Sequence, residues 1–119
     1  MVNGVPTSSR ARTKVGERLR EARRLIESDY DTPWTLHRLA RRVRLPRFAF
    51  PGAYFLAYGE TPLDHLRRVR AHAAACLLLT ARTPADVALR VGYTTERLFY
   101  SDYRRIFRAD PDRLSRLER

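Results

Sequence analysis

The sequence predicts an all-α protein of about seven helices, arranged as two helix-turn-helix subdomains that a long central helix joins. Three observations lead to this prediction. Apolar residues recur at intervals of three and four along most of the chain, and no segment alternates between apolar and polar residues as a half-buried strand does. Helix-start signals recur between these segments. The pattern of apolar residues also repeats after a shift of 48 residues.

The first predicted helix spans about residues 14–28, where apolar residues fall at helical spacing against a charged face. It follows a basic segment without any period, residues 1–13, which we expect to be a disordered tail. Thr35 then caps a second helix, and Leu45 and Pro46 end it.

The third helix contains the two strongest helix breakers, Pro51 and Gly52, between the aromatic residues Phe50 and Tyr54. A proline inside a helix costs about 3 kcal/mol, whereas a proline in the first turn is well tolerated. We therefore predict a short or displaced helix from about Phe50 to Tyr58.

Four more helices are predicted in the second half of the chain, the first of them a long helix that ends near Thr80. Each begins at a capping residue, and in three of them proline suits the first helical position. Their start signals are "GETPLD" (59–64), "TPAD" (83–86), Thr94-Thr95 and Asp110-Pro111.

The repeat relates two helix-turn-helix units. Under the shift of 48 the apolar positions of the first short helix fall on those of residues 83–93. With one more residue inserted, Phe50 and Tyr54 fall on Phe99 and Tyr103. Each unit is then a short helix, a tight turn and a second helix with an aromatic pair four residues apart. Two such units in register are much stronger evidence than one.

The charge balance indicates the class of partner. The chain of 119 residues carries 24 Lys and Arg against 13 Asp and Glu, for a formal net charge of +11. So basic a chain favours a polyanion, above all nucleic acid. No apolar run is long enough for a membrane helix and no signal-peptide core is present, so we expect a cytoplasmic protein with no membrane contact. The single cysteine, Cys76, excludes an internal disulfide and is expected in the core.

Residues 86–114, "DVALRVGYTTERLFYSDYRRIFRADPDRL", resemble the DNA-binding domain of the AraC/XylS family of bacterial transcription regulators. The family pattern is I-A-x-x-x-G-F-x-x-x-x-x-F-x-x-x-F-[KR] with a later proline. It is matched here by Val87, Ala88, Gly92, Tyr93, Phe99, Tyr103, Arg104 and Pro111. The resemblance runs over about residues 15–116. In size the chain is similar to the stand-alone members of the MarA, SoxS and Rob kind, which implies no effector-binding domain.

The resemblance implies an N-terminal helix-turn-helix subdomain with an atypical recognition helix over residues 14–60, a linker helix over 61–81 and a C-terminal helix-turn-helix subdomain over 82–119. It also implies a nucleoid-associated bacterial regulator without a cofactor. Such a regulator binds double-stranded DNA as a monomer and reads the major groove mainly through its second helix-turn-helix.

The resemblance further carries the family's base-reading positions over to Glu96, Arg97, Tyr100 and Ser101 in the second subdomain. Arg97 suits guanine O6 and N7, and Glu96 can accept from cytosine N4. In the first subdomain the base-reading positions are Arg47 and Phe48, followed by Pro51 and Gly52, which lack hydrogen-bonding side chains. Phosphate contacts are expected from Thr94, Thr95, Arg104, Arg105, Arg41, Arg42 and Arg44.

Two departures from the family pattern concern the backbone. Arg44 replaces the glycine usual at the first turn, and Arg108 replaces the glycine usual before the final helix. A left-handed backbone at either position would cost an arginine roughly 1 kcal/mol.

Other functions stay open at this stage. The fold also suits a protein-interaction module that contacts RNA polymerase or another regulator and binds DNA weakly or without specificity. An enzyme is not expected, because the sequence has no glycine-rich phosphate loop, nucleophile elbow or paired catalytic carboxylates. The three histidines, His37, His65 and His72, do not form a metal pair with a third ligand.

Overall fold

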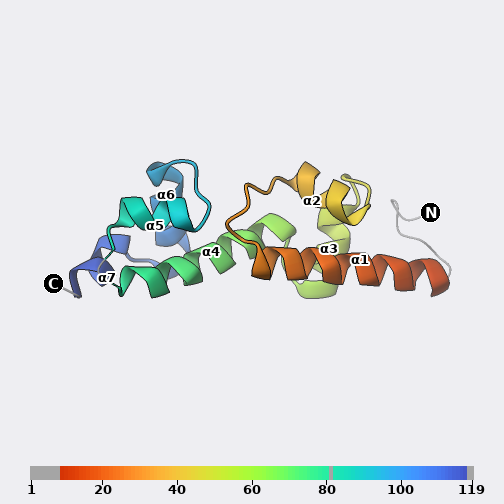
Figure 1. Cartoon of the computed structure of the whole chain (residues 1–119). Helices are drawn as coiled ribbons and strands as arrows, with labels where there is room; N and C mark the ends of the chain where they lie inside the picture. The colour runs from red at the N-terminus through yellow and green to blue at the C-terminus, as the bar shows by residue number, and fades with distance from the viewer. Residues whose placement is uncertain (1–8, 81, 118–119) are drawn as a thin grey trace. The chain divides into compact units, whose positions relative to one another are not determined.

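The computed structural model describes residues 9–80 and 82–117, and every regular element within these ranges is an α-helix (Figure 1). The expectation of an all-α chain with about seven helices is confirmed. The helices are α1 (Ser9–Ser28), α2 (Leu36–Val43), α3 (Phe50–Tyr58), α4 (Pro62–Leu78), α5 (Pro84–Arg90), α6 (Glu96–Phe107) and α7 (Pro111–Leu117).

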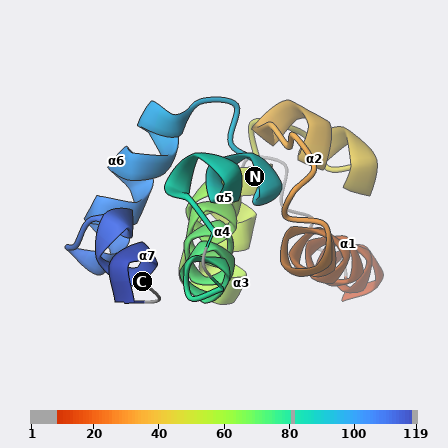
Figure 2. The same cartoon turned by 60° about the vertical axis from the view of Figure 1, so that its left-hand side comes forward.

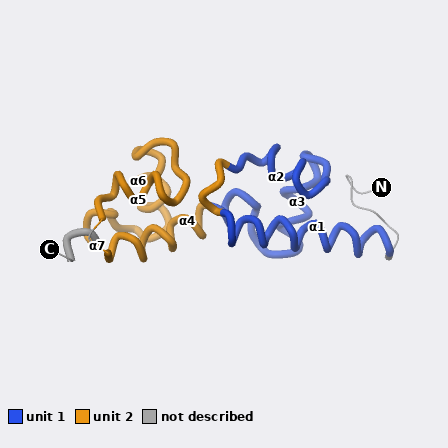
Figure 3. The backbone as a smooth tube through the Cα atoms, viewed as in Figure 1, with its two compact units in different colours: residues 1–29, 34–66 blue, residues 30–33, 67–119 orange. Residues whose placement is uncertain are grey.

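The chain divides into two compact units (Figure 3). Unit 1 comprises Met1–Asp29 and Trp34–Leu66, and unit 2 comprises Tyr30–Pro33 and Arg67–Arg119. Helix α4 therefore begins in unit 1 and continues into unit 2. Each unit contains one of the two predicted helix pairs, α2 with α3 and α5 with α6.

Helix α1 begins at Ser9, earlier than the sequence predicted. Residues 9–13 were expected in a disordered tail, and this part of the expectation is wrong, while residues 1–8 lie outside the described part of the chain. Further along, α1 buries one face, as a three- or four-residue apolar spacing requires. The buried residues are Leu19, Ala22, Leu25 and Ile26.

The core of unit 1 also contains a buried histidine, at a position where the family has an aromatic packing residue. His65, at the start of α4, is only 2% exposed. Its Nδ1 shares a hydrogen bond of 2.6 Å with the hydroxyl of Tyr54 on α3. This contact satisfies two buried polar groups at once, which burial away from water requires.

The core of unit 2 is built from the C-terminal part of α4, from α5 and its following turn, and from α6, which Figure 2 shows gathered together with α7. Its buried members are Ala74, Leu78, Val87, Ala88, Val91, Tyr93, Phe99 and Tyr103. The apolar spacing predicted six of these positions to face inward, because helical neighbours at three and four residues share a face.

Two residues that the apolar pattern assigned to the interior lie on the surface. Cys76 of α4 is exposed, so its expected core position is wrong. Leu98 of α6 is also exposed, beside Arg97. Among the helices that the structure describes, none has the length and apolar character to cross a membrane.

Candidate nucleic-acid interface

Helix α6 begins at a well-formed cap. Thr95 adopts an extended backbone, with φ −136° and ψ 147°, and its hydroxyl oxygen accepts from the backbone N–H of Leu98 at 3.2 Å. Glu96 in the first turn complements the positive end of the helix dipole. Accepting this bond occupies an oxygen lone pair of Thr95 and not its hydrogen. The same hydroxyl can therefore donate to a phosphate.

The outer face of α6 carries most of the predicted contact residues of unit 2. Opposite to it, Phe99 and Tyr103 are buried, which fixes the orientation of the helix about its axis. Tyr100 is half-buried. The remaining predicted residues are exposed: Thr94, Thr95, Glu96, Arg97, Ser101, Arg104 and Arg105.

Two aspartates at the start of α7 cover the C-terminal part of this face. The hydroxyl of Tyr100 donates to Asp112 Oδ1 at 2.8 Å. Burial of the ring, and next this bond to a carboxylate, raise the pKa of Tyr100 to about 12. Arg104 Nε donates to Asp110, and its guanidinium lies 5.1 Å from the Tyr100 ring centroid. For base reading by Tyr100 or phosphate binding by Arg104, DNA must displace these aspartates.

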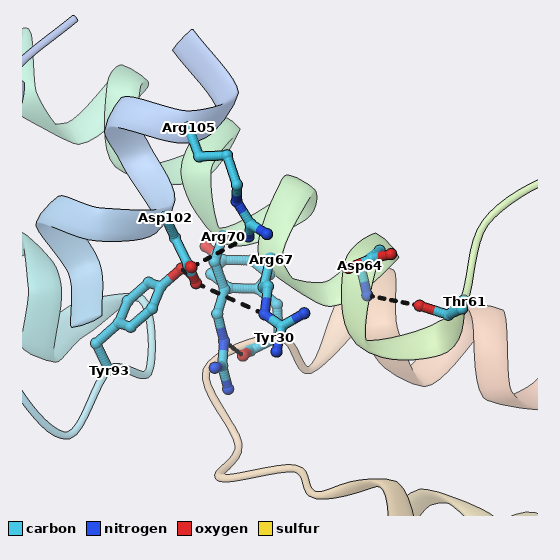
Figure 4. A network of polar contacts seen from close by, with 8 residues as sticks. All are labelled: Tyr30, Thr61, Asp64, Arg67, Arg70, Tyr93, Asp102 and Arg105. Atoms are coloured by element: carbon cyan, nitrogen blue, oxygen red, sulfur yellow. Dashed lines mark hydrogen bonds and ion pairs between the residues drawn. The ribbon is translucent and has the colours of Figure 1, made fainter. Parts of the chain in front are cut away.

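Asp102 on the flank of α6 joins three elements of unit 2 (Figure 4). Its carboxylate accepts from the Tyr93 hydroxyl at 2.8 Å and from Arg105 Nη2 at 3.2 Å, and lies 3.8 Å from Arg67 Nε. Burial and the bond to Asp102 raise the pKa of Tyr93, so the hydroxyl stays a donor. The network fixes α6 against the preceding turn and against α4.

A buried arginine fixes the turn between α5 and α6 from below. Arg70 of α4 donates through Nε to the Tyr30 carbonyl at 2.7 Å and through Nη2 to the Thr32 carbonyl at 2.8 Å. Burial lowers the pKa of Arg70. Gly92 in the turn has φ +104°, and a Cβ added there would approach Arg70 Nη2 to 2.9 Å. The glycine is therefore required by both its backbone angle and its close neighbours.

In unit 1, the equivalent turn contains an arginine. Arg44 adopts φ 59° and ψ 42°, the left-handed conformation that its sequence position predicted. Its side chain is exposed, and its carbonyl accepts from Arg18 Nη1 of α1 at 3.1 Å. Arg108, before α7, has φ 54°. Open space around the Arg44 side chain limits the cost to the backbone itself.

Helix α3 spans Phe50–Tyr58 with Pro51 in its first turn, so the predicted short helix is confirmed. Its N-cap, Ala49, forms no side-chain capping bond and lies in the helical region, with φ −91° and ψ −25°. Arg47, Phe48 and Gly52 are exposed, and Pro51 is half-buried.

The exposed face of this helix differs from that of α6. Of the four predicted base-reading positions in unit 1, only Arg47 offers a hydrogen-bond donor in its side chain. Phe48 is 75% exposed and presents an apolar ring. The predicted phosphate contacts Arg41, Arg42 and Arg44 are all exposed.

Sequence reasoning missed the residues that fix the reader helix. Arg70 contacts a carbonyl 40 residues earlier, and Asp112 contacts a tyrosine 12 residues earlier. No local spacing signals such contacts. The bond between Asp102 and Arg105 had a signal, because residues three apart on a helix are neighbours.

Comparison with known families now adds to this geometry. A family described as helix-turn-helix domain matches residues 39–116, which is most of the chain. The chain belongs to this family. It is 32% identical over 82 residues to the HTH-type transcriptional regulator AlkR of Acinetobacter baylyi, an alignment that covers 68% of this chain. The chain spans only 27% of the length of that relative.

Solved structures show the same fold. A probable AraC family transcriptional regulator from Rhodopseudomonas palustris has a TM-score of 0.75 at 24% identity, over 87% of this chain and 98% of that one. The C-terminal domain of AraT, a response regulator from Geobacillus stearothermophilus, has a TM-score of 0.78 at 24% identity, over 84% of both chains.

Taken together, the family match and these neighbours confirm the expected AraC type: the chain is the DNA-binding domain of an AraC-type transcription regulator. The expectation that it is not an enzyme is confirmed by the same family. For this AraC-type domain, double-stranded DNA is the partner that the family gives.

Proposed function

We propose that this AraC-type domain recognises a specific DNA sequence mainly through α6, which enters the major groove. The observation that carries the proposal is the contrast between the exposed faces of α6 and α3. Arg97 and Ser101, one helical turn apart on α6, are exposed polar side chains on a helix whose orientation is fixed. The matching positions of α3 are Phe48 and Gly52, which cannot donate or accept through a side chain.

In this proposal the two units contribute differently to binding. Arg97 pairs with a guanine and Glu96 with a cytosine, since both side chains match the hydrogen-bonding edges of these bases. Unit 1 holds the backbone of the DNA through Arg41, Arg42 and Arg44. Phosphate contacts supply affinity without sequence information. The domain binds as a monomer, and it acts on the bacterial nucleoid in the cytoplasm.

The test compares two alanine variants at equivalent positions. Binding sites are first selected from random duplex DNA with the wild-type chain. Affinities for the selected duplex and for a random duplex are then measured for Arg97→Ala and for its matched control, Phe48→Ala. A lost bidentate base contact costs about 1–3 kcal/mol, roughly five- to 150-fold.

We expect Arg97→Ala to lose that much affinity for the selected duplex and little for the random one. Phe48→Ala should change the ratio of the two affinities much less. If Arg97→Ala left that ratio unchanged, base readout by α6 would be wrong. A selected site with two conserved boxes, of which Phe48→Ala relaxes one, would show that α3 reads bases as well.

A second candidate function, binding of another protein through unit 1, is supported by the apolar surface of α3. It does not compete with DNA binding by α6, because different helices carry the two.

A further inference from the structure

Helix α3 exposes large apolar side chains that its own unit does not cover. Phe55 is 53% exposed and Leu56 is 81% exposed, and the helix carries no charged residue. Single exposed apolar residues are ordinary on protein surfaces. Here, however, three of the six large apolar side chains exposed within the described residues lie in positions 48–56. We call Phe55 and Leu56 the apolar pair.

A groove in unit 1 lies next to the apolar pair. It measures about 460 Å³ and is lined by Arg20, Arg23, Arg24, Glu27, Ser28 and Tyr58. The Arg23 guanidinium lies 4.7 Å from the centroid of the Tyr58 ring, at the C-terminal end of α3. Phe55 and Tyr58 are three residues apart on this helix and are therefore neighbours on its surface. The groove and the apolar pair form one continuous surface.

The charges in and beside this groove are mixed. Arg24 forms two hydrogen bonds with the carboxylate of Glu21, at 2.8 and 3.0 Å. Arg23 Nε lies 3.5 Å from Glu27 Oε2. Charge-assisted pairs of this kind hold the arginine side chains in place along α1.

These features decide among the classes of ligand. A DNA backbone would meet the carboxylates of Glu21 and Glu27 together with the arginines, which disfavours phosphate. A small apolar ligand would find a lining that is mostly charged, unlike the apolar walls of typical ligand pockets. A helix of another protein can place apolar side chains on the apolar pair and carboxylates on the arginines.

We propose that the groove and the apolar pair form a docking site for an amphipathic helix of a partner protein. This helix carries large apolar residues on one face and acidic residues beside them. The net charge of +11 attracts an acidic partner and repels a second copy of this chain. The proposal does not depend on base readout by α6, which lies in unit 2.

The test uses two designed helical peptides of about 18 residues, long enough for appreciable helix in water. Both carry the same leucine face; one has glutamates beside it and the other has lysines. Each is titrated into the isotope-labelled full chain while backbone amide resonances are recorded. We expect saturable shifts in residues 20–28 and 55–58 with the glutamate peptide. The lysine peptide should bind about tenfold more weakly or worse.

Variants locate the contact. Phe55→Ser combined with Leu56→Ser should weaken the glutamate peptide by about tenfold, as loss of about 1.4 kcal/mol does. Leu89→Ser, an exposed leucine of unit 2, is the matched control and should change nothing. Arg20→Gln combined with Arg24→Gln should weaken the glutamate peptide and reduce the salt dependence of its binding. A thermal melt of each variant checks that the fold is intact.

Other outcomes overturn the proposal. They are equal binding of both peptides, shifts outside these residues, or no binding by either peptide. A concentration-dependent dimer that Phe55→Ser with Leu56→Ser abolishes would assign the surface to a second copy. Loss of affinity for random duplex DNA in that double variant would assign it to DNA. The affinity ratio of Arg97→Ala tests DNA readout separately, so the two proposals can fail independently.

Discussion

Positions 44 and 92 occupy the same place in the two helix-turn-helix units, and they solve the same turn in different ways. Both backbones have positive φ, 59° at Arg44 and 104° at Gly92. At Arg44 the side chain points into solvent, whereas a Cβ at position 92 would meet Arg70 and the backbone of Asp31 within 3.0 Å. A positive φ alone therefore does not demand glycine. The demand becomes strict where neighbouring atoms also close the space.

The recognition helices differ in the same graded way. Both keep a buried aromatic pair, Phe50 with Tyr54 and Phe99 with Tyr103. The core constrains these positions equally in the two units, because burial of large rings stabilises each fold. The outer faces are under no such constraint, so one is polar and the other apolar. The repeat preserves what folding needs and leaves function to diverge.

The largest expected effect separates the two turns. Gly92→Ala should lower the free energy of unfolding by about 2 kcal/mol or more, because strain at positive φ adds to the contact with Arg70. Arg44→Gly should change it by less than about 0.5 kcal/mol, since relief of left-handed strain offsets the flexibility of glycine. Urea denaturation of both variants measures the difference. Equal losses in both would mean that packing around Gly92 contributes nothing.

The helix starts should also differ. Thr95→Ala removes the side-chain cap of α6 and should cost about 1 kcal/mol of stability. Ala49→Ser should change stability by less than about 0.5 kcal/mol, because Ala49 lies in the helical region and not in the extended region that a capping serine needs. Thermal melts report both. A gain of about 1 kcal/mol from Ala49→Ser would show that α3 accepts a cap after all.

A smaller effect is expected at the acidic cover of α6. Asp110→Asn leaves Arg104 without its carboxylate partner, so this arginine can neutralise one more phosphate. The slope of log affinity against log salt should steepen by about 0.9 for any duplex. Unit 1 offers a control in Asp64→Asn, away from the reader helix. An unchanged slope for Asp110→Asn would remove Arg104 from the phosphate contacts.

The smallest effect is spectroscopic. Tyr100 has no counterpart in α3, where the equivalent residue is Pro51. The folded state holds the Tyr100 proton up to a pKa of about 12, against an ordinary value of 10.0. Its contribution to stability is therefore complete below pH 10 and is lost as pH rises towards 12.

Asp112→Asn should lower this pKa without bringing it to the ordinary value, because burial remains the larger cause. Phenolate absorbance during an alkaline titration measures it, and Tyr100→Phe identifies the signal. A pKa that does not move would mean that Asp112 does not hold the Tyr100 hydroxyl in solution.

Much of the fold was predictable because local chemistry determines it. Thr35, Thr83 and Thr95 cap helices where the sequence predicted starts, and each accepts from the N–H three residues on. Pro51 fixed the start of α3, since a proline without an N–H is tolerated only in a first turn. The start of α1 was predicted too late, because residues 9–13 lack apolar spacing although they are helical.

The candidate site was predictable only in part. Exposure of Arg97 and Ser101 follows from the helical spacing of Phe99 and Tyr103, which the sequence alone displays. The engagement of Tyr100 with Asp112 does not, because it joins two helices across a turn. Base and phosphate contacts by these residues stay predictions until DNA binding is measured.

The sequence by itself determined the helices, their caps, the repeat and the family of this protein, because these depend on residues a few positions apart. Only the tertiary structure decided which polar groups are available. It brought Arg70 to the carbonyls of Tyr30 and Thr32, and it left the apolar pair on the surface beside an arginine-lined groove. Hydrogen bonds and burial depend on distance in space, and distant segments of a chain meet only when it folds.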